Sequence, residues 1–160
     1  MTHEARADGY TIERARHVSP DLLAALAELV PVLSPGRRPP DADEMQAIVG
    51  DPRLHLCVAR APGGAIAGSV SLIFYQVPTG LRARIEDLVV LPSHRGQGLG
   101  RALMEQAMRT ARSAGAHVLD LTSNPSRLEA NQLYLALGFT RWETNVYRLV
   151  LDQPGDGGPG

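Results

Sequence analysis

Three glycines in five positions, Gly96, Gly98 and Gly100, lie between an apolar run rich in β-branched residues and a segment with helical spacing. Glycine costs roughly 0.8–1 kcal/mol relative to alanine inside a helix, so glycines at a helix start need a compensating gain. The first amides of a helix are unpaired and carry a positive dipole end, and without Cβ atoms an anion can reach them. The loop therefore predicts either a phosphate cradle or a turn that lets the helix pack close to the sheet.

Two common phosphate-binding loops do not fit this stretch. A Walker loop needs Gly-Lys-Ser or Gly-Lys-Thr, and the chain has no lysine, because all 16 of its basic residues are arginine. A dinucleotide fingerprint that starts at Gly96 needs glycine where Arg101 stands, and one that starts at Gly98 ends at Leu103. What remains is the sequence RGQGLG, with the spacing R-x-x-G-x-G.

The order of periodic segments predicts one mixed sheet with helices on its faces. Alternating apolar positions indicate strands at 10–16, 53–60, 65–77, 81–91, 116–123 and 142–151, and helical spacing covers 20–33, 41–49, 99–114 and 126–137. Short turns at Pro62–Gly64 and Pro78–Gly80 favour an antiparallel meander. We expect an α/β (α+β) fold: one domain over 10–151, a mostly antiparallel sheet of six to seven strands, about four helices, and flexible tails at 1–9 and 152–160.

Composition excludes several classes of protein. A formal net charge of −1 gives no general attraction for nucleic acid or an anionic membrane. The single cysteine, Cys57, excludes an internal disulfide and a multi-cysteine zinc site, and its apolar neighbours indicate a small buried side chain. The histidines lack metal-ligand spacing, so no metal site is expected. Without a leader pattern or an apolar run near 20 residues, we expect a cytoplasmic protein that binds neither nucleic acid nor membrane.

The stretch IEDLVVLPSHRGQGLGRALM, followed by LTSNPSRLEANQLYLALGF, resembles the GCN5-related N-acetyltransferase (GNAT) superfamily. The first part matches its acetyl-CoA signature, and the second matches the next strand and helix. The resemblance is specific from about Ile85 to Phe139 and rests upstream on element order alone. It implies a GNAT-like fold and transfer of the acetyl group of acetyl-CoA to a primary amine by direct attack in a ternary complex. A non-catalytic acyl-CoA-binding regulatory module on this fold is the alternative.

The resemblance also implies where acetyl-CoA binds. In relatives the strand before the loop bulges, its backbone pairs with the pantetheine, and the loop amides hold the pyrophosphate. An asparagine on the later helix, here Asn131, often contacts the cofactor. Arg101 follows the loop, and the alternative for it is a solvated position on the helix. The implied cofactor-binding residues are Leu88, Val89, Val90, Arg95, Gly96, Gln97, Gly98, Leu99, Gly100, Arg101 and Asn131.

Acetylation of an amine also needs a proton acceptor. With a pKa of about 10.4, only about one amine in 2,500 is neutral at pH 7, so a nearby carboxylate helps to remove the proton. Strand alternation puts Glu86 on the face of Leu88 and Asp87 on the opposite face. The resemblance turns the face of Glu86 into the substrate cleft, so Glu86 is the candidate base and Asp87 the second choice. The alternative for Glu86 is a solvent-facing or salt-bridged carboxylate.

The leaving thiolate needs a proton or a strong hydrogen bond, and the resemblance nominates Tyr134. Tyr134 also lies on the apolar stripe of its helix, so a place in the core is the alternative. A phenol of pKa about 10 facing a thiolate of about 8.5 makes full transfer uphill by about 2 kcal/mol, which favours a hydrogen bond.

The acceptor, a small-molecule or peptide amine, stays open. Relatives build its cleft from the regions that correspond here to 33–45 and 74–82, and these carry acidic and basic residues alike. Because many relatives dimerise, a homodimer is open as well.

Overall fold

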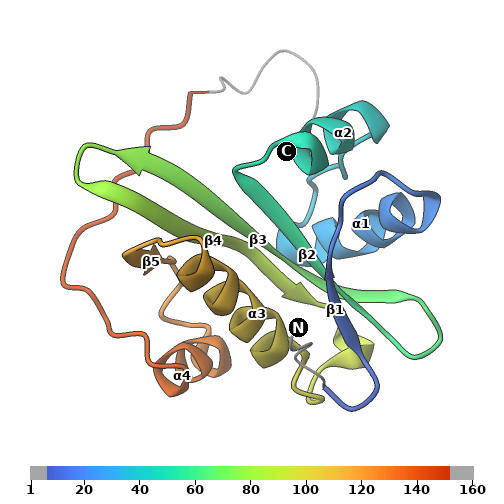
Figure 1. The fold of residues 1–160 in the computed structure, drawn as a ribbon. Coiled ribbons are helices and arrows are strands. Elements are labelled where there is room, and N and C mark those ends of the chain that lie inside the picture. The colour runs from blue at the N-terminus through green and yellow to red at the C-terminus, as the bar shows by residue number, and fades with distance from the viewer. Residues whose placement is uncertain (1–6, 152–160) are drawn as a thin grey trace.

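The computed structural model describes residues 7–151, which form one five-stranded sheet with helices on both faces (Figure 1). The sheet order follows the chain, and every neighbouring pair is antiparallel except the last, which is parallel. The strands are β1 (Thr11–Arg14), β2 (Leu54–Arg60), β3 (Ile66–Val77), β4 (Gly80–Val90) and β5 (Val118–Asp120). The helices are α1 (Pro20–Leu33), α2 (Ala42–Gly50), α3 (Leu99–Ser113) and α4 (Leu128–Ala136), with a 3-10 turn, η1, at Pro92–His94. The mixed, mostly antiparallel α/β fold is confirmed.

The first two helices begin at capping residues that the sequence makes visible. Ser19 caps α1 by accepting a hydrogen bond from the amide of Leu22, and Pro20 occupies the first helical position. Asp41 caps α2 in a reciprocal capping box with Glu44. Both predicted helix starts are therefore confirmed.

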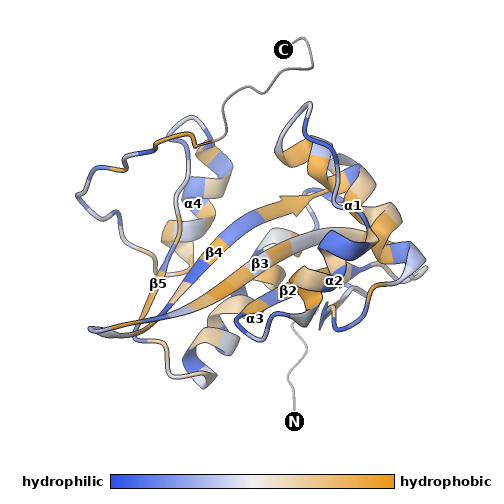
Figure 2. Cartoon of the chain, turned by 90° about the horizontal axis from the view of Figure 1, so that it is seen from above, coloured by the Kyte–Doolittle hydropathy of each residue, from blue (hydrophilic) through white to orange (hydrophobic). Residues whose placement is uncertain are grey.

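The sheet carries a separate apolar core on each face. On one face, α3 and α4 pack over a cluster that contains the fully buried Leu72 and Leu103, and this cluster is called the core of α3. On the other face, α1 and α2 pack over a cluster that contains Leu29 and Met45, and this cluster is called the core of α1. In Figure 2 the two groups of helices lie on opposite sides of the sheet. The sheet is thus buried on both faces, with β4 contributing to each core.

A bulge interrupts β4 just before the glycine loop. Ser69 and Ser71 of β3 are separated by one residue, whereas their partners Val89 and Glu86 on β4 are separated by two. Asp87, inside the bulge, has a φ of 53°, in the left-handed region that non-glycine residues rarely adopt. Bulges redirect side chains and are frequent beside active sites. The bulge that the resemblance implied in this strand is confirmed.

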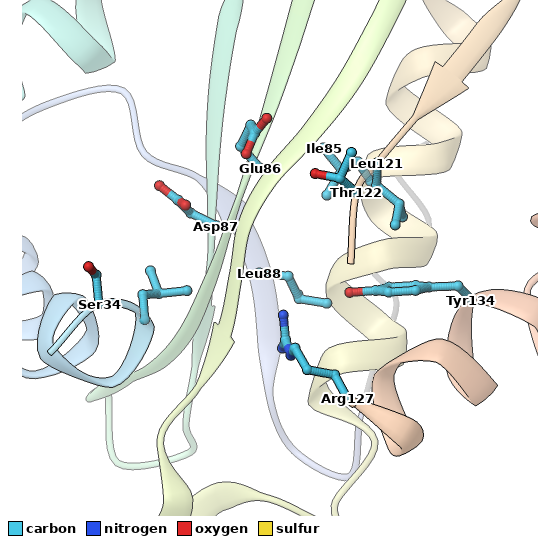
Figure 3. Close-up of a pocket in the computed structure, with 10 residues that line it drawn as sticks. Ser34, Ile85, Glu86, Asp87, Leu88, Leu121, Thr122, Arg127 and Tyr134 are labelled. Carbon is cyan, nitrogen blue, oxygen red and sulfur yellow. The ribbon is translucent and has the colours of Figure 1, made fainter. Parts of the chain in front are cut away.

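The bulge switches the faces of β4. Before it, Ile85 packs in the core of α3, whereas after it Leu88 packs against that core and Val89 belongs to the core of α1. The expectation that Glu86 and Leu88 share a face is therefore wrong, because the extra residue breaks the alternation between them. Glu86 and Asp87 both lie on the side of α1, while Leu88 points toward α4 (Figure 3).

The strand expected at 142–151 does not form. Residues 140–151 have no regular secondary structure and are almost entirely exposed. Alternating apolar residues supply strand propensity but no partner, and a strand exists only where its backbone pairs. Within the described residues the sheet therefore has five strands, not six or seven.

Most of the two expected tails, 1–6 and 152–160, lies outside the described residues. At the inner end of the first, Ala7 is buried against the core of α3. Among the helices between residues 7 and 151, none combines the length and apolar character needed to cross a bilayer.

Candidate active site

β4 and β5 pair only over a short stretch and then separate. The parallel ladder joins Arg82–Arg84 to Val118–Asp120, and beyond these residues the two segments no longer pair. A cleft of about 220 Å³ opens at the split (Figure 3). It is lined by residues 85–88 of β4, the segment after β5, the C-terminal end of α1, and Arg127 and Tyr134 at α4. The split thus brings together residues from both halves of the chain.

Two carboxylates lie on the α1 side of this cleft. Glu86 forms an ion pair with Arg84, whose Nη2 also donates to the Thr122 hydroxyl at 3.0 Å, across the split. No described residue forms an ion pair with Asp87. Asp87 is exposed at the mouth of the cleft, yet its pKa is raised, first by partial desolvation of the carboxylate and then by the charge of Glu86. A carboxylate with a raised pKa is the better proton acceptor of two otherwise similar groups.

Tyr134 belongs both to the core and to the cleft. Its ring is buried in the core of α3 and meets Phe139 edge to face, with centroids 6.1 Å apart. Its hydroxyl points toward Leu88 of the bulge (Figure 3). Burial raises the pKa of Tyr134, against a smaller lowering by the charge of Arg127, so the hydroxyl keeps its proton at neutral pH. The two readings of Tyr134 are therefore compatible.

The glycine loop is open where side chains would otherwise stand. Gly96 and Gly98 have φ values of 75° and 79°, and a Cβ on either would meet no atom within 4 Å. Close packing of helix on sheet therefore does not explain these two glycines. Gly98 is the N-cap of α3, and no side chain caps that helix. The first amides of α3 therefore have no side-chain cap, and the two glycines before them leave the adjacent Cβ positions empty.

A buried tyrosine from the start of the chain supports this loop. The hydroxyl of Tyr10 lies 2.7 Å from Nδ1 of His94 and donates to Oε1 of Gln97 at 3.0 Å. Arg95 donates from Nε to the carbonyl of Val90 at 3.4 Å. The sequence carries no signal for the contact of Tyr10, because its partners are more than 80 positions away. His94 is half-buried where it meets Tyr10.

Of the remaining cofactor candidates, Asn131 and Arg101 make side-chain contacts within the chain, whereas the backbone of 88–90 keeps a free edge. Asn131 donates from Nδ2 to the carbonyls of Asn124 and Arg127, at 2.9 and 2.8 Å, and so holds the turn before α4. Arg101 makes a 3.5 Å ion pair with Glu105 along the surface of α3. Beyond position 84, β4 has no pairing with β5, so the backbone edge at 88–90 that faces the split is available to a ligand.

Residues 22–139 match the Acetyltransferase (GNAT) family, and the chain belongs to that family. The split between β4 and β5 and the glycine loop lie within the matched part, which contains every helix and strand except β1 and the first two residues of α1. No group of three His, Cys, Asp or Glu side chains suited to a metal ion occurs among residues 7–151.

Individual relatives extend this comparison. An aminoalkylphosphonate N-acetyltransferase of Salmonella typhimurium is 35% identical over 99 residues, which cover 61% of this chain and 64% of that protein. A glucosamine 6-phosphate N-acetyltransferase of Trypanosoma brucei brucei is 42% identical over 88 residues, 53% of this chain and 58% of that protein. A crystal structure of a Trypanosoma brucei acetyltransferase, 30% identical, matches with a TM-score of 0.72 over 89% of this chain and 99% of that one. The matches thus span about three fifths of the length of these two curated relatives.

Proposed function

We propose that this protein transfers the acetyl group of acetyl-CoA to the nitrogen of a primary amine in a ternary complex. The observation that carries the proposal is the split between β4 and β5, which gathers two carboxylates and Tyr134 in one cleft. The open glycine loop follows β4 in the chain. Membership of the GNAT family supports the same reaction. The proposed setting is the cytoplasm, and the proposed reaction calls on no metal, nucleic acid or membrane.

The cofactor would bind along the loop and the bulged strand. The amides between Arg95 and Arg101 would hold the pyrophosphate, the backbone at Leu88–Val90 the pantetheine, and Asn131 a further contact from α4. When bound, acetyl-CoA supplies an acetyl carbon whose bond to sulfur breaks as its bond to the amine nitrogen forms. Backbone donors set in advance at the bulge can stabilise the developing negative charge by several kcal/mol.

The carboxylates would take the proton that the amine must lose. Both Glu86 and Asp87 face the α1 side, where the acceptor would enter (Figure 3). Glu86 is our proposed base, held in place by Arg84. Asp87 is the competing candidate, because its raised pKa suits proton transfer.

Tyr134 would serve the departing sulfur. Because the pKa of Tyr134 is raised by burial, its hydroxyl is a hydrogen-bond donor rather than a ready acid. A hydrogen bond to a charged acceptor contributes about 1.5–3 kcal/mol, enough to favour loss of the thiolate without full proton transfer.

The acceptor is proposed as a small amine that also carries an anionic group. The two relatives described above are named for amines of this kind, one a phosphonate and the other a phosphate. At this cleft the carboxylates would attract the ammonium group, and the guanidinium of Arg127 would attract the anion.

Calorimetric titration with acetyl-CoA, with ATP and NAD as controls, tests the first step. We expect selective binding of one acetyl-CoA per chain. Thiol release is then measured with aminoalkylphosphonates, amino-sugar phosphates and uncharged amines. Turnover supports the transferase, binding without turnover on any amine supports the regulatory module, and no binding contradicts both.

A further inference from the structure

We propose that Arg84 and Arg82 select the acceptor through an exchange of ion pairs. The ammonium group of the acceptor takes the place of Arg84 at Glu86, the released guanidinium binds an anionic group of the same acceptor, and Arg82 adds a second guanidinium beside it. The inference rests on the proposed function and names the residues of that site that set the class of acceptor. It gives neither arginine a part in the chemical step.

Three charged side chains follow one another along one face of β4. Arg82, Arg84 and Glu86 stand at alternate positions of a stretch that pairs regularly with β3. The residues between them, Ala83 and Ile85, are buried in the core of α3, so the three charged side chains lie on the side of α1. Neighbours in this row are about 7 Å apart along the strand. The row thus carries two positive charges and then a negative one, which lines the cleft.

The ion pair between Arg84 and Glu86 is open to exchange. The two side chains are 34% and 40% exposed. A pair as exposed as this adds little to stability, because water screens it. The ammonium group of an acceptor and the guanidinium of Arg84 compete for the same carboxylate, so that binding of the first displaces the second.

Thr122 keeps the displaced guanidinium at the cleft. Nη2 of Arg84 donates to the Thr122 hydroxyl at 3.0 Å, and Thr122 lines the cleft on the wall opposite Glu86 (Figure 3). Once Nε no longer donates to Glu86, Arg84 has N–H donors without an acceptor. The oxygens of a phosphate or phosphonate match the donor geometry of a guanidinium. An acceptor with such a group therefore replaces the ion pair that it breaks.

Arg82 supplies a positive charge that the described chain does not neutralise. Its Nε is buried without a hydrogen-bond partner. Among residues 7–151, no carboxylate lies within ion-pair distance of Arg82, although Asp120 stands on β5 as the ladder partner of Arg84. One guanidinium is thus unpaired before the acceptor arrives, and the acceptor releases the other. Together they favour an anion over a neutral group at this end of the row.

A matched pair of acceptors tests the proposal. Aminopropylphosphonate carries the anion and propylamine lacks it, and thiol release gives KM for each. Arg84→Met should raise KM for aminopropylphosphonate roughly 10- to 150-fold, as expected for loss of a hydrogen bond between charged groups. The same substitution should lower KM for propylamine, since its ammonium group no longer competes with Arg84 for Glu86. Structural damage alone would raise both values.

Further variants separate the parts of the row. Thr122→Val removes only the contact across the split and should raise KM for aminopropylphosphonate roughly 2- to 12-fold. Arg84→Lys keeps the charge and should restore part of the preference for the anion. Arg82→Met should raise KM for aminopropylphosphonate and leave propylamine unchanged. Arg112→Met, at an exposed arginine of α3, is the matched control and should change neither value.

Calorimetry in the presence of CoA distinguishes failure of this proposal from failure of the proposed function. We expect aminopropylphosphonate to bind more tightly to the wild type than to the Arg84→Met variant. If this order is found and neither amine is acetylated, the proposed function fails and selection by the arginines stands. Equal changes of KM for both amines in Arg84→Met, equal affinities of the two proteins, or no binding of aminopropylphosphonate to the wild type overturns the selection.

Discussion

Asp87 and Glu86 are the two residues whose roles single substitutions can separate. Glu86→Gln should lower kcat/KM about 10²–10⁴-fold and leave acetyl-CoA affinity nearly unchanged. Asp87→Asn should keep most of the activity, since Asn also tolerates the left-handed backbone of the bulge. Rates measured across pH, with calorimetry for the cofactor, check both expectations.

The reverse outcome would assign the base to Asp87. The charge of Glu86 helps to raise the pKa of Asp87, so Glu86→Gln would then move the acid limb of the rate profile to lower pH. In the folded state the raised pKa of Asp87 also means that its ionisation disfavours folding near pH 7. The Asp87→Asn variant should therefore melt no lower than the wild type.

Tyr134→Phe isolates one hydroxyl. Loss of a hydrogen bond to a developing thiolate, about 1.5–3 kcal/mol, predicts a fall in kcat of roughly 10- to 150-fold. The buried ring keeps its packing against Phe139, so the melting temperature should stay the same. Steady-state rate assays measure the change in kcat, and thermal melts measure the melting temperature. Unchanged kinetics would leave Tyr134 with a structural role only.

Tyr10→Phe tests whether the buried hydroxyl positions the glycine loop. It removes the contacts to His94 and Gln97, and a hydrogen bond worth about 0.5–1.5 kcal/mol predicts a loss in acetyl-CoA affinity of roughly 2- to 12-fold. The value of kcat at saturating cofactor should not change. Tyr75→Phe, on β3, is the matched control. Equal affinity in both variants would contradict a positioning role for Tyr10.

At the scale of elements, α3 is flanked by two glycines that can be compared by substitution. Gly98 and Gly115 stand at its two ends with φ values of 79° and 80°, and a Cβ on either meets nothing within 4 Å. Alanine at each should therefore cost a similar 1–2 kcal/mol of unfolding free energy. Only Gly98→Ala should weaken acetyl-CoA binding, since its methyl group enters the open space of the loop. Denaturant melts and calorimetry compare the two, and equal affinities would contradict the cradle.

The elements differ in how far the sequence determines them. Helices α1 and α2 begin at or within one residue of the predicted starts at 20 and 41, because the caps that fix them are local interactions between neighbours in sequence. The bulge at Asp87 has no local signal, since no glycine stands at its left-handed position, and only family resemblance indicated it. The expected strand at 142–151 shows the opposite limit. Its pattern is clear, but pairing depends on a partner that the pattern does not specify.

The residues of the candidate site also differ in how far the sequence predicts them. The glycine loop and Tyr134 were accessible from sequence, because motif and spacing define them. The ion pair of Glu86 with Arg84, the contact of Arg84 with Thr122 and the support from Tyr10 were not. These contacts depend on how β4 separates from β5 and on segments that are distant in the chain.

At the scale of the whole molecule, the rate at which the Cys57 thiol is alkylated measures how readily the protein unfolds. It lies in the middle of β2 within the core of α3, and burial raises the pKa of its thiol to about 11. We expect no alkylation by iodoacetamide at pH 8 in the native protein and rapid alkylation in denaturant, since the thiolate is the nucleophile. Mass spectrometry follows both reactions. Native alkylation at the denatured rate would show that this core opens freely.

The change of faces along β4 has a consequence for laboratory evolution. Because Leu88 and Val89 face different cores, one strand borders two layers of the molecule that mutate separately. If the proposed function holds, libraries confined to α1, α2 and the segment between them would sample new selectivities while the proposed cofactor half stays intact. Libraries on α3 and α4 would instead disturb the half that we propose binds acetyl-CoA. A search for altered selectivity should therefore start on the side of Ser34.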